Sequence, residues 1–331
     1  MMNIISRSDW DQFYQSHPES HLLQSGQWGK LKSAFGWEAV RVIDGDTGAQ
    51  ILFRKLLIGS SIGYLPKGPI GKITESFLQV INQVCKAHNA VFLKIEPDVF
   101  EPDDFSSNGS LLNGDNVYRT ATIQPQRTIV LSLAGDEKAW LDNMKQKTRY
   151  NIRVAERKNV VVRETHDPDI FYDMVMRTGE RDGFGVHTRS YYEKAYQLFS
   201  ETGQCTILTA FYADMPLAGI MVFANGSRSW YFYGASTEHE RNRMPAYLLQ
   251  LEGMRWAASK GCLTYDLWGV PDYPEDRLES DFLDRHDGLW GVYRFKRGFG
   301  GELRRSVDAV DIVYRPFLYK LYKMIKNRGA E

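Results

Sequence analysis

The order of predicted helices and strands occurs twice along the chain, and this repetition limits the fold more than any single motif. In the first half, acidic, aromatic and apolar positions alternate at helical spacing over residues 1–35. This helical region precedes strands at Glu38–Ile43 and Ala49–Leu57, an amphipathic helix at Thr74–His88, and a strand at Ala90–Ile95. The first half therefore predicts one mixed α/β unit.

The second half follows the same order of helices, strand pair, long helix and strand. Its predicted elements are, in chain order, Asp169–Asp182, Tyr191–Glu201, Thr206–Ala213, Leu217–Asn225, Ser229–Ala235, Pro245–Lys260 and Thr264–Trp268. A chain of 331 residues is long enough for two domains, so each half corresponds to a unit of about 150 residues. The identity between the halves is too weak to define a sequence repeat.

The segment that joins the halves contains no Pro/Gly-rich linker. A strand is predicted at Gln124–Leu133, and one basic helix is predicted at Glu137–Lys158. Glycines and prolines predict a loop at Gly63–Gly71, and a basic amphipathic helix is predicted near the end, at Pro316–Lys326. We therefore expect two rigidly apposed mixed α/β domains with a shared cleft.

Charge and cysteine usage exclude several classes of protein. Lysine plus arginine and aspartate plus glutamate each number 41, which argues against a general nucleic-acid coat but leaves room for a local basic groove. The three cysteines, Cys85, Cys205 and Cys262, form no C-x-x-C pair, and the seven histidines form no H-x-x-x-H or H-E-x-x-H motif. Neither a disulfide framework nor a metal site is expected.

The sequence shows no membrane-targeting pattern. Residues Met1–Asp11 lack an apolar h-region, and no apolar run approaches the roughly 20 residues that span a bilayer. We expect a soluble, cytoplasmic protein, which can also lie at the inner face of the membrane.

Short motifs along the chain carry a family resemblance. They are Trp28–Lys32 (W-x-x-x-K), Lys67-Gly68-Pro69, Ile95-Glu96-Pro97, Ala121–Pro125, Trp230–Ser236, Tyr265-Asp266-Leu267 and Phe295-Lys296. Each motif is weak alone, but in this order and spacing they resemble the FemABX family, the peptidoglycan interpeptide-bridge aminoacyltransferases. The resemblance extends over nearly the whole chain.

The resemblance implies a fold and an activity. The fold would be two GNAT-like domains side by side, with the C-terminal helix returning to the first. Residues 1–136 with 308–331 would form the precursor-binding domain, and residues 137–307 the second domain. The activity would move an amino acid from aminoacyl-tRNA to the stem-peptide amine of UDP-MurNAc-pentapeptide or lipid II. No cofactor is implied, and a monomer is expected.

The segment Arg241–Ala246 favours a donor other than acyl-CoA. GNAT-like folds usually bind the CoA pyrophosphate with a glycine-rich loop that opens a helix. Here the glycines are absent, and Pro245 removes an amide donor. Two alternatives stay open: a GNAT-type acyl-CoA N-acyltransferase acting on a sugar or peptide amine, and a non-catalytic module that binds the precursor.

Three residues are candidates for the chemistry by position in the family motifs. Lys296 would stabilise the oxyanion and the released ribose oxygen, and Phe295 would shape the acceptor pocket. Glu96 would orient the attacking amine or accept its proton. The alternatives are a solvated lysine in a basic run, a core phenylalanine and a salt-bridged glutamate.

Substrate-binding candidates also follow from the resemblance. Lys32 falls where the family binds a phosphate of the precursor, with Lys30 as the residue most easily confused with it. The second phosphate clamp of the family is Arg-x-x-x-Tyr, and here it reads His187-x-x-x-Tyr191, with Arg189 offset by two. Two readings of this departure stay open: Arg189 supplies the guanidinium from the neighbouring turn, or the acceptor differs, for example a lipid-linked rather than a soluble precursor.

Two tyrosines and two basic helices complete the candidates. Tyr231 and Tyr233 lie two apart on one predicted strand, so we expect them on one face, lining the acceptor site. The basic segment Lys145–Lys158 is a candidate for the tRNA acceptor stem, although a solvated face is the more common meaning of such a run. The C-terminal helix could rest on an anionic membrane surface or close the first domain.

Overall fold

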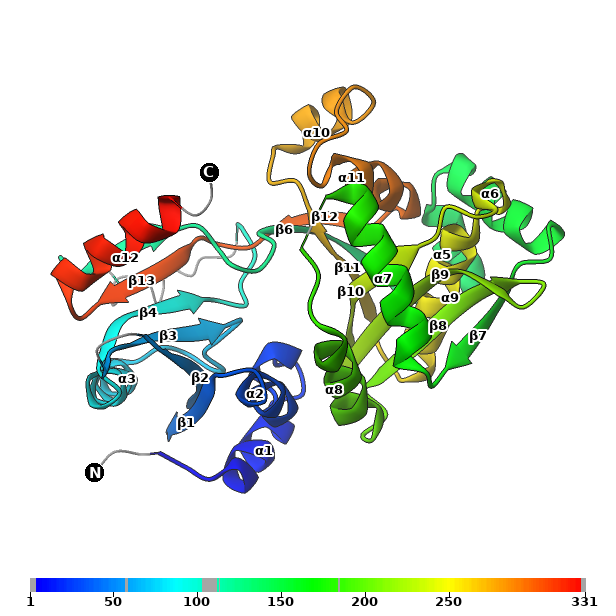
Figure 1. Cartoon of the computed structure of the whole chain (residues 1–331). Helices are drawn as coiled ribbons and strands as arrows, with labels where there is room; N and C mark the ends of the chain where they lie inside the picture. Colours follow the sequence, from blue (N-terminus) through cyan, green and yellow to red (C-terminus); the bar gives the residue numbers. More distant parts are fainter. Residues whose placement is uncertain (1–3, 57–58, 103–111, 113, 184, 329–331) are drawn as a thin grey trace. The chain divides into compact units, whose positions relative to one another are not determined.

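The computed structural model describes residues 4–56, 59–102, 112, 114–183 and 185–328. The chain forms two compact units, drawn together in Figure 1. The first unit comprises Met1–Gln126 and Arg305–Glu331, and the second comprises Arg127–Arg304. The predicted domain boundary at residue 137 differs from this division because the strand Arg127–Ser132 pairs within the second unit.

The first unit is built on a mixed six-stranded sheet. Its strands are β1 (Glu38–Asp44), β2 (Thr47–Lys55), β3 (Ser61–Pro66), β4 (Ala90–Glu96), β5 (Val117–Thr120) and β13 (Ala309–Val313), in the sheet order β1-β2-β3-β4-β13-β5. Only the β3–β4 pair among these is parallel. The helix between these two strands makes their crossover, as parallel pairing requires.

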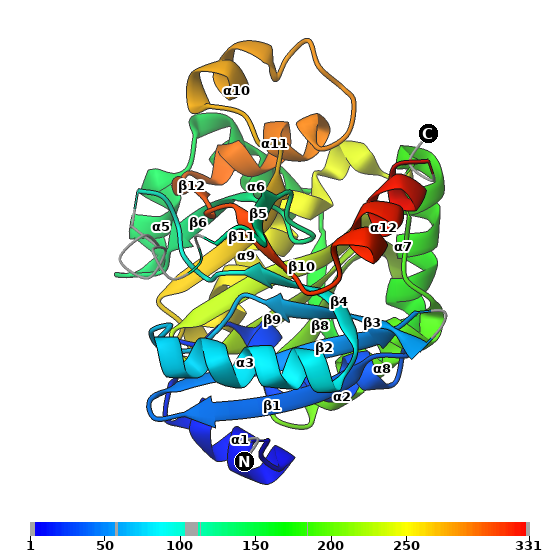
Figure 2. The ribbon, with the colours of Figure 1, turned by 90° about the vertical axis from the view of Figure 1, so that its left-hand side faces the viewer.

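Helices and a buried core complete the first unit. The helices are α1 (Arg7–Gln15), η1 (Leu22–Gln24), α2 (Gly26–Ser33), α3 (Glu75–Ala87) and α12 (Pro316–Arg328). In Figure 2, α3 lies in front of the sheet that contains β1 to β4. Its apolar face, with Phe77, Ile81 and Val84, packs on β1 and β4. Thr74 caps this helix by accepting a hydrogen bond from the amide of Phe77.

The second unit contains a seven-stranded sheet of the same local design. Its strands are β6 (Arg127–Ser132), β7 (Val161–Thr165), β8 (Cys205–Tyr212), β9 (Met215–Asn225), β10 (Arg228–Ser236), β11 (Thr264–Val270) and β12 (Glu302–Arg305), in the sheet order β12-β6-β11-β10-β9-β8-β7. The β10–β11 pair is parallel, and the helix between the two strands makes the crossover. The same design therefore occurs in both units: an antiparallel pair followed by a parallel pair around a helix.

Helices cover the sheet of the second unit. They are α5 (Glu137–Asn143), α6 (Gln146–Arg157), α7 (Pro168–Asp182), α8 (Arg189–Ser200), η4 (Arg241–Arg243), α9 (Pro245–Ser259), α10 (Glu275–Asp281), α11 (Trp290–Lys296) and η5 (Arg297–Phe299). In Figure 1, α7 and α8 lie in front of the strands β8 to β10, and α9 lies behind them. No helix in the described part of the chain is both long and apolar enough to cross a membrane.

The predictions and the structure differ at several elements, among them short ones that were not predicted, such as β5, β12 and α10. The predicted loop Gly63–Gly71 begins inside β3, where Gly63 allows close approach to β4, because a Cβ there would lie 2.9 Å from Leu93 Cδ1. Strand β13 was not predicted, although it lies between β4 and β5. The single basic helix predicted at Glu137–Lys158 is two helices, α5 and α6.

The break between α5 and α6 has a local cause. Met144 and Lys145 are extended, and the amide of Lys145 donates to the carbonyl of Gly298 (2.9 Å) rather than to a helical carbonyl. The Arg149 guanidinium then donates to the carbonyls of Leu141 (3.1 Å) and Met144, which end α5. A tertiary contact of this kind cannot be read from helical spacing.

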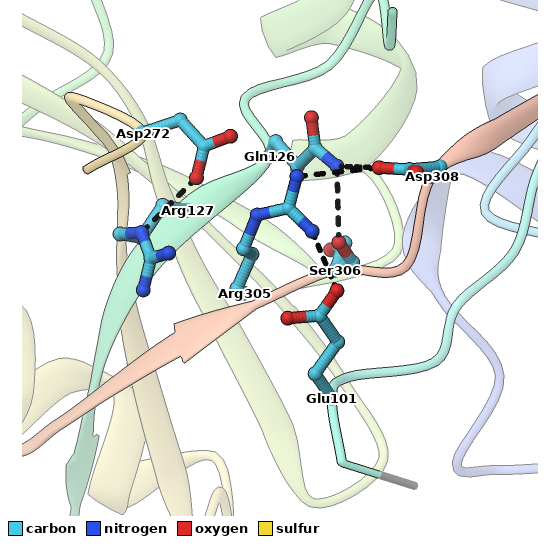
Figure 3. A network of polar contacts seen from close by, with 7 residues as sticks. All are labelled: Glu101, Gln126, Arg127, Asp272, Arg305, Ser306 and Asp308. Atoms are coloured by element: carbon cyan, nitrogen blue, oxygen red, sulfur yellow. Dashed lines mark hydrogen bonds and ion pairs between the residues drawn. The ribbon is translucent and has the colours of Figure 1, made fainter. Parts of the chain in front are cut away.

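The chain leaves the first unit after Gln126 and returns to it at Arg305, and these two segments are hydrogen-bonded. The amide of Ser306 donates to the Gln126 carbonyl (2.7 Å), and the Gln126 side chain donates to Asp308 Oδ1 (2.7 Å). Figure 3 shows Arg305 donating to Glu101 (2.5 Å) and to Asp308 (3.2 Å). Within the second unit, Arg127 pairs with Asp272 (3.1 Å).

Candidate functional site

Lys296 is a buried lysine at the end of α11 in the second unit. Its side chain is 5% exposed, and Nζ donates to the carbonyl of Gly269 at 2.9 Å. The same Nζ lies 5.4 Å from the centre of the Tyr231 ring. Burial lowers the pKa of Lys296 to about 7, and the charge of Asp266 opposes that shift. A lysine with such a pKa can gain or lose its proton near neutral pH.

The carbonyl that holds Lys296 lies in an irregular part of β11. The pairing of β11 with β6 shifts between Asp266 and Gly269, and Trp268 has a positive φ of 62°. Asp266 stabilises this irregularity, because its carboxylate accepts hydrogen bonds from the Trp268 amide (2.7 Å) and from the Thr128 hydroxyl. Asp266 belongs to the motif Tyr265-Asp266-Leu267 but was not predicted as a site residue, although an acid in an apolar strand was a signal for it.

Phe295 is half-buried beside Lys296 and packs in an aromatic cluster. Its ring contacts Tyr247 edge to face, with centroids 5.0 Å apart, and Phe299 in the same way at 5.1 Å. These contacts belong to the core of the second unit. Packing alone accounts for a phenylalanine here, so its role in an acceptor pocket stays a prediction.

Tyr231 and Tyr233 do not share a face of β10, which corrects the expectation from their spacing. The register of β10 on β9 shifts between them, so Tyr231 pairs with Val222 and Tyr233 with Met221. Because Val222 and Met221 are consecutive, their side chains point to opposite faces of the sheet. A β-bulge at Phe232 therefore sends Tyr231 toward Lys296 and Tyr233 toward α8.

Tyr233, Tyr191 and His187 form an aromatic group beside α8. The His187 ring stacks on Tyr191 with centroids 3.9 Å apart, and the Tyr233 hydroxyl donates to the Tyr191 hydroxyl at 3.5 Å. Tyr191 is buried, which raises its pKa to about 12, whereas His187 is exposed. The structure thus brings together two members of the predicted clamp and one of the predicted tyrosines.

Arg189 lies apart from this aromatic group. Its guanidinium pairs with Asp169 (2.7 Å) and Asp173 (3.2 Å) on α7 and lies over the Tyr172 ring. These contacts engage Arg189 with acids of the neighbouring helix. The structure therefore does not support the idea that Arg189 replaces the missing arginine of the clamp beside Tyr191.

Lys32 lies on α2 in the first unit and is distinct from Lys30. Lys32 is half-buried, with Nζ 4.9 Å from the centre of the Trp28 ring, whereas Lys30 is exposed. Burial lowers the pKa of Lys32 to about 8. Lys32 therefore has the more enclosed environment of the two lysines, and its role in binding a phosphate stays a prediction.

Glu96 is buried at the end of β4, and its carboxylate oxygens accept structural hydrogen bonds. The donors are the amide of Ile123, the amide of Gln124 (3.1 Å) and the hydroxyl of Tyr64 (3.0 Å). Burial raises the pKa of Glu96, and these bonds and the charge of Lys67 oppose that shift. Its geometry suits positioning of residues 123–124, and a role in proton transfer stays a prediction.

A pocket of about 510 Å³ lies in the first unit beside the Lys67-Gly68-Pro69 motif. Its other walls come from the turn before η1, with His17 and His21, and from Asp98 after β4. Lys67 is buried, and its Nζ donates to the Ser306 hydroxyl at 2.8 Å. The sequence did not identify this pocket, because its walls come from three segments that are distant in the chain.

The segment Arg241–Ala246 is engaged with α6. Lys158 Nζ donates to the Asn242 carbonyl (2.8 Å), and the Arg243 guanidinium donates to the Lys158 carbonyl (2.7 Å). Met244 has a positive φ of 56°, and Pro245 begins α9 without an amide hydrogen. Within the described ranges, no cluster of three or more histidine, cysteine or acidic side chains is arranged for a metal ion.

Curated relatives align with nearly all of the chain. The lipid II:glycine glycyltransferase of Staphylococcus epidermidis is 25% identical over 413 aligned positions, which cover 99% of this chain and 96% of that protein. The enzyme of the same name from Staphylococcus aureus is 24% identical and covers 98% and 95%. Because the alignments exceed 331 positions, these relatives contain segments with no counterpart here.

Solved structures show the same fold. The crystal structure of FemX superposes with a TM-score of 0.83 at 22% identity, covering 96% of this chain and 98% of FemX. A tandem GNAT protein from the clavulanic acid biosynthesis pathway has a TM-score of 0.55 at 11% identity and covers 93% and 96%. These likenesses confirm the predicted fold class of two GNAT-like mixed α/β domains.

The family assignment follows from the whole length of the chain. The FemAB family model matches residues 5–103, 102–210 and 204–327. The matched ranges include every candidate residue described above, from Lys32 to Lys296. The chain belongs to the FemAB family.

Proposed function

We propose that this protein transfers an aminoacyl group from aminoacyl-tRNA to the stem-peptide amine of a peptidoglycan precursor. The observation that carries the proposal is the buried Lys296, held by the Gly269 carbonyl beside Tyr231. Aminolysis of an activated ester needs positioning and charge stabilisation rather than a metal or a nucleophilic triad. A buried cation supplies that stabilisation in a site that excludes water.

The reaction forms one bond and breaks one bond. The nitrogen of the acceptor amine attacks the ester carbonyl carbon, forms the amide C–N bond, and the C–O bond to the ribose breaks. In its protonated form, Lys296 stabilises the oxyanion of the tetrahedral intermediate and gives a proton to the leaving ribose oxygen. The amine loses a proton as the amide forms, and this proton returns to Lys296, which is then positively charged again.

We propose a precursor-binding role for Lys32 and for the group of His187, Tyr191 and Tyr233. Lys32 offers a compact cation to a phosphate. The group beside α8 offers two hydroxyls and an imidazole, which binds phosphate most strongly when it is protonated. Phe295 and Tyr231 shape the space around Lys296, and Glu96 positions residues 123–124.

The relatives bear on the acceptor. Those quoted above are named lipid II:glycine glycyltransferases, which supports a peptidoglycan precursor as acceptor and favours its lipid-linked form. The acceptor proposed for this chain is therefore lipid II, with UDP-MurNAc-pentapeptide as the soluble alternative.

The donor is proposed from the segment before α9. An acyl-CoA pyrophosphate would need glycines, which Arg241–Ala246 lacks, and an amide donor at position 245, which Pro245 removes. Lys158 and Arg243 already hold this segment. Aminoacyl-tRNA fits better, with the basic helix α6 as a candidate contact for the acceptor stem. Saturable CoA binding in calorimetry would favour an acyl-CoA transferase instead.

The decisive experiment mixes the protein with all labelled aminoacyl-tRNAs and reads the precursor by mass. We expect a mass increase of one or more aminoacyl residues on lipid II or on UDP-MurNAc-pentapeptide. If neither acceptor gains mass with any charged tRNA, the proposal fails. Tight precursor binding without turnover would instead identify a binding module.

A further inference from the structure

Helix α12 has two apolar faces, and one of them packs on the sheet of the first unit. Tyr319 and Tyr322 lie against Phe92 of β4, each with ring centroids 5.2 Å apart. The Tyr319 hydroxyl also donates to Asp311 Oδ2 of β13 at 2.8 Å. This inward face fixes the helix on the unit without using its other apolar side chains.

The other face forms what we call the α12 stripe: Phe317, Leu321, Met324 and Ile325. These side chains are 79%, 41%, 56% and 64% exposed. Their spacing of four, three and one residues places them on one side of an α-helix. Four large apolar side chains gathered on one exposed helix face mark an interaction surface rather than scattered exposure.

The charged side chains of the same helix are all basic. The sequence Pro316–Arg328 contains four basic residues, Lys320, Lys323, Lys326 and Arg328, and no acidic residue, although the whole chain is neutral. Lys320 and Lys323 are exposed. Lys320 lies one turn from both Phe317 and Met324, so cationic groups border the stripe.

We propose that the α12 stripe docks on the surface of an anionic phospholipid bilayer. In an interfacial helix the exposed apolar face enters the boundary of the acyl chains, and the flanking lysines contact the lipid phosphates. The docking itself is argued from the helix alone. Only its biological purpose rests on the proposed function, because a lipid-linked acceptor must be reached at a membrane surface.

The two other candidate occupants fit less well. A second copy joined through the same stripe would bring two sets of lysines together, and like charges would repel. A tRNA matches the lysines but offers no apolar surface to Phe317 or Ile325. The bilayer is the occupant that matches both the stripe and its charge.

The test is vesicle flotation with the full chain and no cell-wall precursor. Vesicles of phosphatidylcholine alone are compared with vesicles of equal parts phosphatidylcholine and phosphatidylglycerol. We expect the protein to float with the anionic vesicles only, and the floated fraction to fall with added salt. Because one amphipathic helix without a second anchor binds reversibly, binding is expected to be moderate.

Two double variants and matched controls locate the contact. Phe317→Ser with Ile325→Ser, and separately Lys320→Glu with Lys323→Glu, are each expected to lower the partition coefficient about tenfold. The apolar control is Leu263→Ser with Leu283→Ser, at exposures of 60% and 56% in the second unit. The charge control is Lys72→Glu with Lys86→Glu, both exposed in the first unit. Neither control should change binding.

Several outcomes would overturn the proposal. These are no flotation with anionic vesicles, equal binding by the stripe variants and the wild type, or a dimer in sedimentation that the stripe variants lose. A loss of tRNA binding in the lysine variant without a loss of flotation would assign the surface to nucleic acid. A large fall in melting temperature on Phe317→Ser would show that the stripe is covered within the chain.

A second assay separates this inference from the proposed activity. The stripe variants should transfer at wild-type rate to soluble UDP-MurNAc-pentapeptide and more slowly to lipid II in vesicles. If no acceptor is modified by the wild type but flotation depends on the stripe, the activity is wrong and the membrane surface stands. If transfer occurs and flotation does not, the opposite holds.

Discussion

Lys94 in the first unit and Lys296 in the second are both buried lysines, yet their surroundings differ. Lys94 Nζ pairs with Asp311 Oδ1 (2.9 Å) and donates to the Thr120 hydroxyl (2.5 Å) and the Ala121 carbonyl (2.9 Å). Lys296 Nζ donates to one carbonyl, and within the described residues no acid lies within ion-pair distance of it. The first lysine forms an ion pair with a buried acid, whereas the buried acid nearest in effect to the second, Asp266, acts on it only as a more distant charge.

This difference separates a structural lysine from a candidate catalytic one. A buried pair such as Lys94 and Asp311 satisfies both charges and joins β4 to β13. A buried lysine without a paired acid keeps its charge at a cost, and its pKa falls to about 7. A pKa in that range, in a site with polar neighbours, is typical of groups that take part in chemistry.

The largest expected effect is on transfer by Lys296→Ala. Removing a group that stabilises an oxyanion costs about 10²–10³ in rate. We expect kcat for aminoacyl transfer to fall by about that factor, with the fold retained in circular dichroism. Lys138→Ala, on an exposed face of α5, is the control and should transfer at wild-type rate. Wild-type kcat in Lys296→Ala would remove the central residue of the proposed mechanism.

The next effect is on stability and concerns Lys94→Met. This change leaves Asp311 buried without its cation, which costs about 3–5 kcal/mol of unfolding free energy. Denaturant unfolding should show the loss as a lower midpoint with an unchanged slope. The exposed Lys72→Met should stay within about 0.5 kcal/mol of wild type. If Lys94→Met were equally stable but inactive, the comparison between the two lysines would be reversed.

Sequence patterns predicted most of the elements that position these lysines, and the reasons are local. Strand patterns predicted β1, β2, β8 and β9, and an amphipathic pattern over Thr74–His88 predicted α3. The motif Phe295-Lys296 identified the buried lysine itself. Each of these signals lies in consecutive residues, so no tertiary information was needed.

The remaining features depend on contacts between distant segments. Part of strand β3 was predicted as a loop because Gly63 is typical of loops. Only the structure shows that Gly63 is needed for close packing against Leu93 of the neighbouring strand. The bulge at Phe232 reverses the face of Tyr233 relative to Tyr231, which a period of two cannot anticipate. Arg189 was a candidate clamp until Asp169 and Asp173 were found beside it. Side-chain partners from other elements decide such cases.

The third prediction concerns the pH dependence of stability. In the unfolded chain Lys296 would titrate near 10.5, but in the folded protein its pKa is about 7. Between these values the unfolded state binds the additional proton, so this lysine makes stability rise with pH, by up to about 1.4 kcal/mol per unit. Below pH 7 both states are protonated and its slope vanishes.

Unfolding curves from pH 6 to 9 check this slope. The wild type should gain unfolding free energy relative to Lys296→Met as the pH rises above 7, while Lys72→Met should follow the wild type. A wild type that gains nothing over Lys296→Met would mean that Lys296 stays charged in the folded state. Lys296 would then be a charged structural lysine like Lys94, and the contrast between the two lysines would fail.

The smallest effect concerns Lys32, whose burial lies between that of Lys296 and that of an exposed lysine. A half-buried cation beside Trp28 can bind a phosphate without passing its proton, so its loss should weaken precursor binding and spare the chemical step. We expect Lys32→Ala to raise KM for the precursor about tenfold with kcat nearly unchanged, in line with about 1.4 kcal/mol of lost binding. Lys30→Ala, two residues earlier and exposed, should change neither constant.

If Lys32→Ala and Lys30→Ala had equal effects, the positive electrostatic potential of the whole helix, rather than a phosphate contact of Lys32, would explain them. A fall in kcat alone would place Lys32 beside Lys296 in function, and burial would no longer distinguish lysines that bind from lysines that act in the chemical step.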